Sequence, residues 1–138
     1  GPVYQAGTLS GNPVATTAGL VTLQHCTPDV YAKLNDTANQ VASIVTQALQ
    51  AAGVAHQLQK AGNLFSIFFA SDPVQNFAQA KTQDAAAYAT FFHTMLENGV
   101  WLPPSAFESW FVSAAHSQKD LEVIERAASR AAAAVASS

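Results

Sequence analysis

A long amphipathic helix with a clear start and a clear end constrains the fold of this 138-residue chain more than any other feature. Thr27 and Pro28 are residue types that favour the N-cap and first turn of a helix, and Gly53 favours helix termination. Between them, apolar side chains recur at steps of three and four residues: Val30, Leu34, Ala38, Val41, Val45, Ala48 and Ala52. This spacing predicts a helix with one apolar face, which a second layer must cover.

Two segments rich in β-forming residues predict a hairpin after this helix. Residues 54–60 and 64–70 flank Ala61-Gly62-Asn63, and the second segment reads Leu-Phe-Ser-Ile-Phe-Phe-Ala. Aromatic residues of this kind suit a buried strand, and a glycine between the two segments suits a tight turn. A further strand is predicted at 110–114, so we expect a mostly antiparallel sheet of three to four strands.

Three more helices are predicted from N-cap residues and the apolar spacing that follows them: 13–25, 85–98 and 118–135. The polar segment 74–83 is expected to hold a short turn of helix. In the helix at 85–98, five large side chains are expected to be buried: Tyr88, Phe91, Phe92, Met95 and Leu96. The order of elements predicts an α+β fold in which helices cover one face of a small sheet.

The composition narrows the classes of partner. Only 11% of the residues are charged and 49% are hydrophobic, which indicates a face that a partner covers. The six Lys and Arg residues are dispersed and the net charge is −3, so neither nucleic acid nor a membrane is an expected partner. Without a long apolar run or an apolar leader, the chain is expected to be cytoplasmic. Cys26, the single cysteine, excludes an internal disulfide and is expected to be a buried thiol.

Metal and nucleophile chemistry have little support in the sequence. Four histidines stand at positions 25, 56, 93 and 116, with no HExxH, no CxxC and no GxSxG motif. We therefore expect no metal site and no hydrolase activity.

The segment from Gly7 to Pro13 has the features of an anion-binding loop. Gly7 and Gly11 allow positive φ, Thr8 and Ser10 offer hydroxyl donors, and Asn12-Pro13 is typical of a helix start whose free amides attract an anion. A simple turn into a helix explains the same residues equally well.

Glu108 is the one acidic residue in an aromatic-rich segment. It follows Pro103-Pro104 and lies among Phe107, Trp110 and Phe111, which would leave its carboxylate partly desolvated and able to meet a cation. A solvated carboxylate bonded to backbone amides is the alternative.

Three segments resemble the glutamate-1-semialdehyde 2,1-aminomutases, which are pyridoxal-phosphate-dependent enzymes of the class III aminotransferases. They are Val-Tyr-Gln-Ala-Gly-Thr-Leu-Ser-Gly-Asn-Pro at 3–13, Phe-His-Thr-Met-Leu-Glu-Asn-Gly-Val-Trp-Leu-Pro-Pro-Ser at 92–105 and Phe-Glu-Ser-Trp-Phe-Val-Ser-Ala-Ala-His-Ser at 107–117. The first is shared in looser form with other aminotransferases of this fold, whereas the other two are more particular to the aminomutases.

The resemblance implies a fold-type-I homodimer, of which this chain would form the carboxyl-terminal third. Residues 1–26 would end the large cofactor domain, and 27–138 would be the small domain. The family isomerises glutamate-1-semialdehyde to 5-aminolevulinate for tetrapyrrole (porphyrin) synthesis, starting from the pyridoxamine 5'-phosphate form of its cofactor. By resemblance, Gly7 and Thr8 contact the pyridoxal 5'-phosphate of the neighbouring subunit, and Glu108 lines the catalytic pocket.

The same resemblance limits what the chain can do alone. The Schiff-base lysine of the family precedes the Gly-Thr segment, whereas all four lysines here follow it: Lys33, Lys60, Lys81 and Lys119. We therefore expect the chain by itself to be inactive. A related ω-aminotransferase and a non-catalytic dimerisation module are the alternative interpretations.

Overall fold

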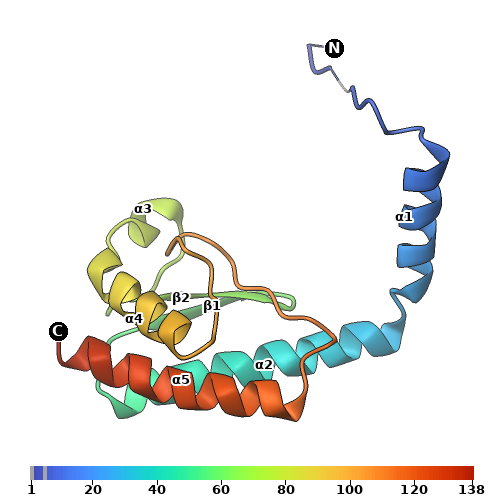
Figure 1. Ribbon diagram of the computed structural model, residues 1–138. Helices are drawn as coiled ribbons and strands as arrows, with labels where there is room; N and C mark the ends of the chain where they lie inside the picture. Colours follow the sequence, from blue (N-terminus) through green and yellow to red (C-terminus); the bar gives the residue numbers. More distant parts are fainter. Residues whose placement is uncertain (1, 5) are drawn as a thin grey trace. The chain divides into compact units, whose positions relative to one another are not determined.

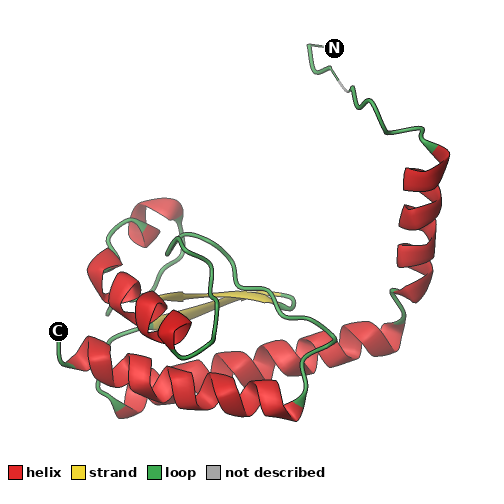
Figure 2. Ribbon diagram, viewed as in Figure 1, coloured by secondary structure: helices red, strands yellow, loops and turns green. Residues whose placement is uncertain are grey.

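The computed structural model describes residues 2–4 and 6–138 and divides the chain into two compact units, Gly1–Lys33 and Leu34–Ser138. The elements are α1 (Pro13–His25), α2 (Pro28–Ala51), β1 (Gln57–Ala61), β2 (Leu64–Phe68), α3 (Phe77–Ala80), α4 (Ala85–Glu97) and α5 (Gln118–Ala136) (Figures 1 and 2). The α+β class expected from the sequence is confirmed. The unit boundary falls inside α2, and the assignment of 1–26 to a large domain and 27–138 to a small domain stays a prediction.

The first unit holds the turn before α1, α1 itself and the start of α2, and none of its described residues, 2–4 and 6–33, is buried. None of the residues of α1 is buried, and large apolar side chains such as Val14 and Leu23 are exposed. Cys26 is also exposed, with its thiol donating to Thr22 O at 3.3 Å, so the expectation of a buried thiol is wrong. Burial was predicted because a free cysteine favours apolar surroundings, but the described part of this unit has no buried residues that could surround the thiol.

The predicted long helix is confirmed as α2, with its termini at the expected signals. Thr27 Oγ1 accepts a bond from Val30 N, and Gly53 ends the helix with a φ of 72°, the left-handed conformation that glycine adopts without strain. The buried face consists of Thr37, Ala38, Val41, Ala42, Val45 and Leu49. This face supplies one side of the core of the second unit.

The hairpin is confirmed, but the sheet is smaller than predicted. In the described residues β1 and β2 form a two-stranded antiparallel sheet with Leu58 opposite Ile67. The third strand predicted at 110–114 is reduced to one bridge between Trp110 and Phe65. The chain cannot continue along β2 because it turns at Ser113, whose carbonyl accepts a bond from His116 N. The expected three to four strands are therefore wrong.

The core of the second unit lies between α2, β2, α4 and α5. On α4 the side chains of Tyr88, Phe91 and Met95 are buried, Phe92 is half-buried, and Leu96 is exposed, contrary to expectation. Leu96 falls outside the buried stripe because Tyr88, Phe91 and Met95 already follow the three- and four-residue spacing of one helix face. Helix α5 packs along α4 with four buried alanines, Ala127, Ala128, Ala131 and Ala132. Small side chains permit this close approach.

Asp120 stabilises the start of α5, and this stabilisation is expected to depend on pH. Its Oδ2 accepts bonds from Ser117 N and Ser117 Oγ, each at 2.7 Å, which lowers the pKa of the carboxyl below its usual 3.8. A lowered folded-state pKa gives stability that is complete above the unfolded value and lost as the pH falls through the folded value. Asp120→Asn should therefore lower the urea midpoint at pH 7.

The difference between Asp120→Asn and the unmodified protein should shrink toward zero between pH 7 and about pH 2. Asp36→Asn is the control, since Asp36 is exposed on α2 and far from any helix start. An Asp120→Asn effect that is the same at both pH values would contradict this origin.

Candidate functional site

The predicted anion-binding loop forms a turn ahead of α1, but not for the conformational reason expected. Ser10 N donates to Gly7 O at 3.1 Å and Asn12 N donates to Leu9 O at 3.0 Å. Neither Gly7 nor Gly11 has a positive φ; that conformation belongs to Gly53, Gly62 and Gly99. What Gly7 provides is space, since a Cβ built there would lie 2.3 Å from Ser10 Oγ.

The start of α1 is not the source of free amides that the sequence suggested. Pro13 has no N–H, and Asn12 Oδ1 accepts bonds from Val14 N at 3.0 Å and Ala15 N at 3.2 Å. Thr16 N donates to Asn12 O at 2.9 Å, so the first turn is fully satisfied within the chain. This part of the expectation is wrong because the N-cap competes with any anion for the same amides.

Donors remain in the loop itself. Within the described part of the chain, the amides of Thr8, Leu9 and Gly11 and the hydroxyls of Thr8 and Ser10 donate no hydrogen bond. The first acidic residue of the sequence is Asp29, so no carboxylate of this segment would repel an anion. The loop thus offers neutral backbone and hydroxyl donors of the kind that coordinate phosphate oxygens.

Glu108 lies on the loop that connects α4 to α5, and its carboxylate is exposed. Ser105 N donates to Glu108 Oε1 at 3.2 Å, and Glu108 N donates back to Ser105 O at 3.2 Å. The expected desolvation is absent from this unit because the neighbouring rings of Phe107 and Phe111 are 51% and 75% exposed. One oxygen of the carboxylate is thus held by a backbone amide, and the other has no partner among the described residues.

Two buried side chains, Tyr88 and Gln83, contact this loop, and neither was predicted to belong to the site. The Tyr88 hydroxyl donates to Pro103 O, and its pKa is raised to about 12 by burial and by the Glu108 carboxylate, with the Trp110 side chain acting in the opposite direction. Gln83, 7% exposed, donates from Nε2 to Ala106 O at 3.2 Å. Tyr88 was predicted only as a core residue. Nothing in the local sequence links either residue to a loop 15 or 23 positions away.

The candidate residues fall into both units. Gly7 and Thr8 belong to the first unit, and Glu108 belongs to the second, so each half is described by itself. The described residues contain no group of three His, Cys, Asp or Glu side chains that could hold a metal ion. Within the same residues, every helix is too short or too polar to cross a bilayer.

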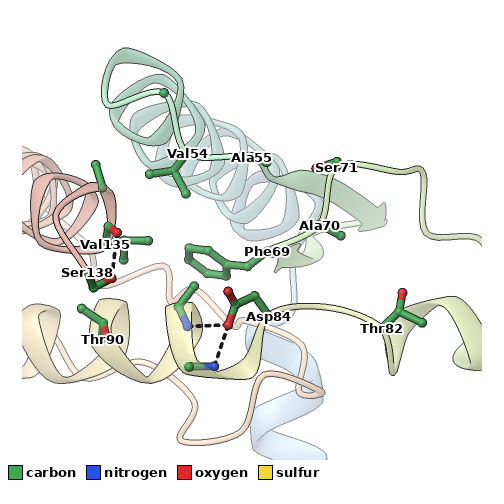
Figure 3. A pocket seen from close by; sticks show the side chains of 14 residues that line it. Val54, Ala55, Phe69, Ala70, Ser71, Thr82, Asp84, Thr90, Val135 and Ser138 are labelled. Carbon is green, nitrogen blue, oxygen red and sulfur yellow. Dashed lines mark hydrogen bonds between the residues drawn. The ribbon is translucent and has the colours of Figure 1, made fainter.

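A cavity of about 660 Å³ in the second unit is separate from these candidates. It lies between the end of α2, the end of β2, the start of α4 and the end of α5, and Val54, Phe69, Asp84 and Val135 line it (Figure 3). Asp84 Oδ1 is engaged in capping α4 through Ala86 N and Ala87 N, both at 2.9 Å. The lining residues include no Lys, Arg or His and none of the predicted site residues, so the cavity adds nothing to the candidate chemistry.

Comparisons with known proteins confirm the resemblance read from the sequence. No protein-family model matches the chain. The chain is 54% identical over 137 residues to the glutamate-1-semialdehyde 2,1-aminomutase of Cutibacterium acnes, and 50% identical over 136 residues to that of Propionibacterium freudenreichii subsp. freudenreichii. Each match covers 99% of this chain but only 31% of the relative, so the chain spans about a third of the length of these enzymes.

Solved structures show the same fold at lower identity. An ω-transaminase from Sphaerobacter thermophilus matches 96% of the chain with a TM-score of 0.77 at 22% identity, over 30% of its own length. A transaminase with bound pyridoxal phosphate matches 98% of the chain with a TM-score of 0.79 at 21% identity, also over 30% of its length. At these identities the likeness shows the fold alone.

Proposed function

We propose that this chain is the carboxyl-terminal third of a glutamate-1-semialdehyde 2,1-aminomutase, an isomerase that produces 5-aminolevulinate for tetrapyrrole (porphyrin) synthesis. The observation that carries the proposal is the 54% identity to such an enzyme over 99% of the chain. Its working form is a homodimer in the cytoplasm. The exposed apolar side chains of α1 favour a covering partner, and the single cysteine is typical of a reducing compartment.

Gly7 and Thr8 would hold the phosphate of pyridoxal 5'-phosphate, or of its pyridoxamine form, bound in the neighbouring subunit. The backbone amides of Thr8, Leu9 and Gly11, which donate to none of the described residues, fit this group, since phosphate oxygens accept several hydrogen bonds at once. The narrow space beside Gly7 also fits, because a side chain there would displace Ser10 Oγ. When bound, the cofactor supplies the electron sink for moving an amino group.

Glu108 would contact the amino groups of the substrate. Its first oxygen is oriented by Ser105 N, which leaves the second oxygen to accept a hydrogen bond from an ammonium group. The carboxylate orients the amine and compensates its positive charge. This residue and the loop at Gly7 supply two parts of the pocket, and the lysine that carries the cofactor belongs to preceding polypeptide.

The test is to assay the full-length enzyme and this 138-residue chain side by side with glutamate-1-semialdehyde. The full-length enzyme should form 5-aminolevulinate without an external amino acceptor, and the chain alone should form none. Net transamination that requires an external acceptor would replace the proposal with an ω-aminotransferase. If the full-length protein forms dimers but does not bind the cofactor and shows neither isomerisation nor transamination, a dimerisation module would replace the proposal.

A further inference from the structure

The loop that carries Glu108 has little regular backbone structure to fix its position. Pro103 and Pro104 contribute no N–H groups, and the only bond between this loop and the sheet backbone in the described residues is that from Trp110 N to Phe65 O, at 2.7 Å. The turn closed between Ser105 and Glu108 sets the local shape of the loop. It does not set where that turn stands relative to the core.

Three side chains from other elements hold the carbonyl groups of this loop. Tyr88 Oη, from α4, donates to Pro103 O, and Gln83 Nε2, from the residue before the α4 N-cap, donates to Ala106 O at 3.2 Å. Ser66 Oγ, from β2, donates to Glu108 O at 3.2 Å. The backbone around Glu108 is thus held by side-chain donors from β2, from α4 and from the residue before α4, in addition to the buried side chains of Ala106 and Trp110.

Burial leaves the side chain of Gln83 with one unpaired polar atom. It is 7% exposed, and its Oε1 is the one buried side-chain oxygen or nitrogen among the described residues that has no hydrogen-bond partner. A buried carbonyl without a partner destabilises a fold, and an apolar side chain of similar size would not. The bond from Nε2 to Ala106 O is therefore the only polar contact that its amide group gains from burial.

We propose that Gln83 is a positioning residue for Glu108, acting through Ala106 O to hold the loop so that the carboxylate meets the amino group of the substrate. Tyr88 acts with it from the same side through Pro103 O. Burial and the nearby Glu108 carboxylate raise the pKa of Tyr88 to about 12, so its hydroxyl stays a donor throughout the physiological range. This inference rests on the proposed function of Glu108.

The test uses Gln83→Leu in the full-length enzyme, together with Glu108→Gln and the double variant. Gln83→Leu should lower kcat/KM about 10-fold, less than the about 10²-fold that a 1 Å misplacement can cost, because Ser66 and Tyr88 still donate to the loop. Its urea midpoint should stay close to that of the unmodified enzyme, because removal of the unpaired Oε1 offsets the loss of the donor to Ala106 O. In the Glu108→Gln background, Gln83→Leu should change kcat/KM less than about 2-fold, because its effect passes through the carboxylate.

Two further variants support the interpretation of this comparison of the single and double variants. Gln59→Leu is the matched control, because the Gln59 amide also donates to a loop carbonyl, Val74 O at 2.7 Å, and should leave kcat/KM unchanged. Tyr88→Phe removes only a hydroxyl and should reproduce the coupling to Glu108 if Gln83→Leu folds poorly. Unchanged activity in Gln83→Leu, or an equal loss with and without the Glu108 carboxylate, would overturn the inference alone. A Glu108→Gln enzyme with full activity would overturn the proposed role of Glu108 itself.

Discussion

Glu108→Gln in the full-length enzyme is expected to lower kcat by about 10²-fold, the lower range for losing a group that handles protons or charge at the reacting atoms. The substitution keeps the shape of the side chain, and glutamine Oε1 can still accept the bond from Ser105 N. The loop should therefore stay in place while the negative charge is lost. The loss should appear in single-turnover and steady-state rates of 5-aminolevulinate formation.

Glu122→Gln is the matched control for this prediction. Glu122 is an exposed carboxylate on α5 and belongs to the same unit, so its loss of charge changes the net charge equally without touching the loop. It should retain the full rate. If both variants lose activity to the same degree, the effect comes from overall charge and Glu108 has no special position in the pocket.

Phe91→Ala is expected to destabilise the 138-residue chain by about 3–5 kcal/mol, the usual range for removing a fully buried aromatic side chain. Phe91 is 0% exposed, and its ring lies 5.5 Å from that of Phe69 and 6.5 Å from that of Trp110, centre to centre. Since small domains are stable by about 5–15 kcal/mol, this single change should remove a large part of the total. Urea denaturation followed by circular dichroism measures it.

Phe111→Ala provides the comparison for the same chemical change at the surface. Phe111 is 75% exposed and should change the free energy of unfolding by about 0.5 kcal/mol or less. Equal losses at Phe91 and Phe111 would contradict the packing described for the core. The result also bears on the site, because Phe91 contacts Trp110, two residues after Glu108.

The helices and the hairpin could be predicted because local signals determine their ends. Asn12, Thr27 and Asp84 act through bonds to amides two or three residues away, so the sequence alone contains the whole interaction. The third strand could not be predicted in the same way. Trp110 and Phe111 have strong β-propensity, but whether a strand continues depends on the turn at Ser113 and on space beside β2.

The candidate site was predicted less completely than the fold. The sequence identified Gly7, Thr8 and Glu108 through resemblance, and their roles stay predictions. It placed Glu108 among aromatic rings because Phe107, Trp110 and Phe111 are close in sequence, yet Trp110 is buried in the core while Phe107 and Phe111 are exposed. The sequence did not predict the hydrogen bond from Gln83 to the loop, because a contact between residues 23 positions apart produces no periodic pattern in the sequence.

The proposed cofactor pocket combines the loop at Gly7 and Thr8 of one subunit with the Glu108 carboxylate of the other. Full-length subunits carrying Thr8→Glu, which opposes a phosphate, and subunits carrying Glu108→Gln can be co-expressed with different tags, and the mixed dimer isolated. Each parent dimer should be nearly inactive, whereas the mixed dimer should regain about half of the wild-type activity, because one of its two sites has both residues intact. A mixed dimer no more active than its parents would contradict this proposal.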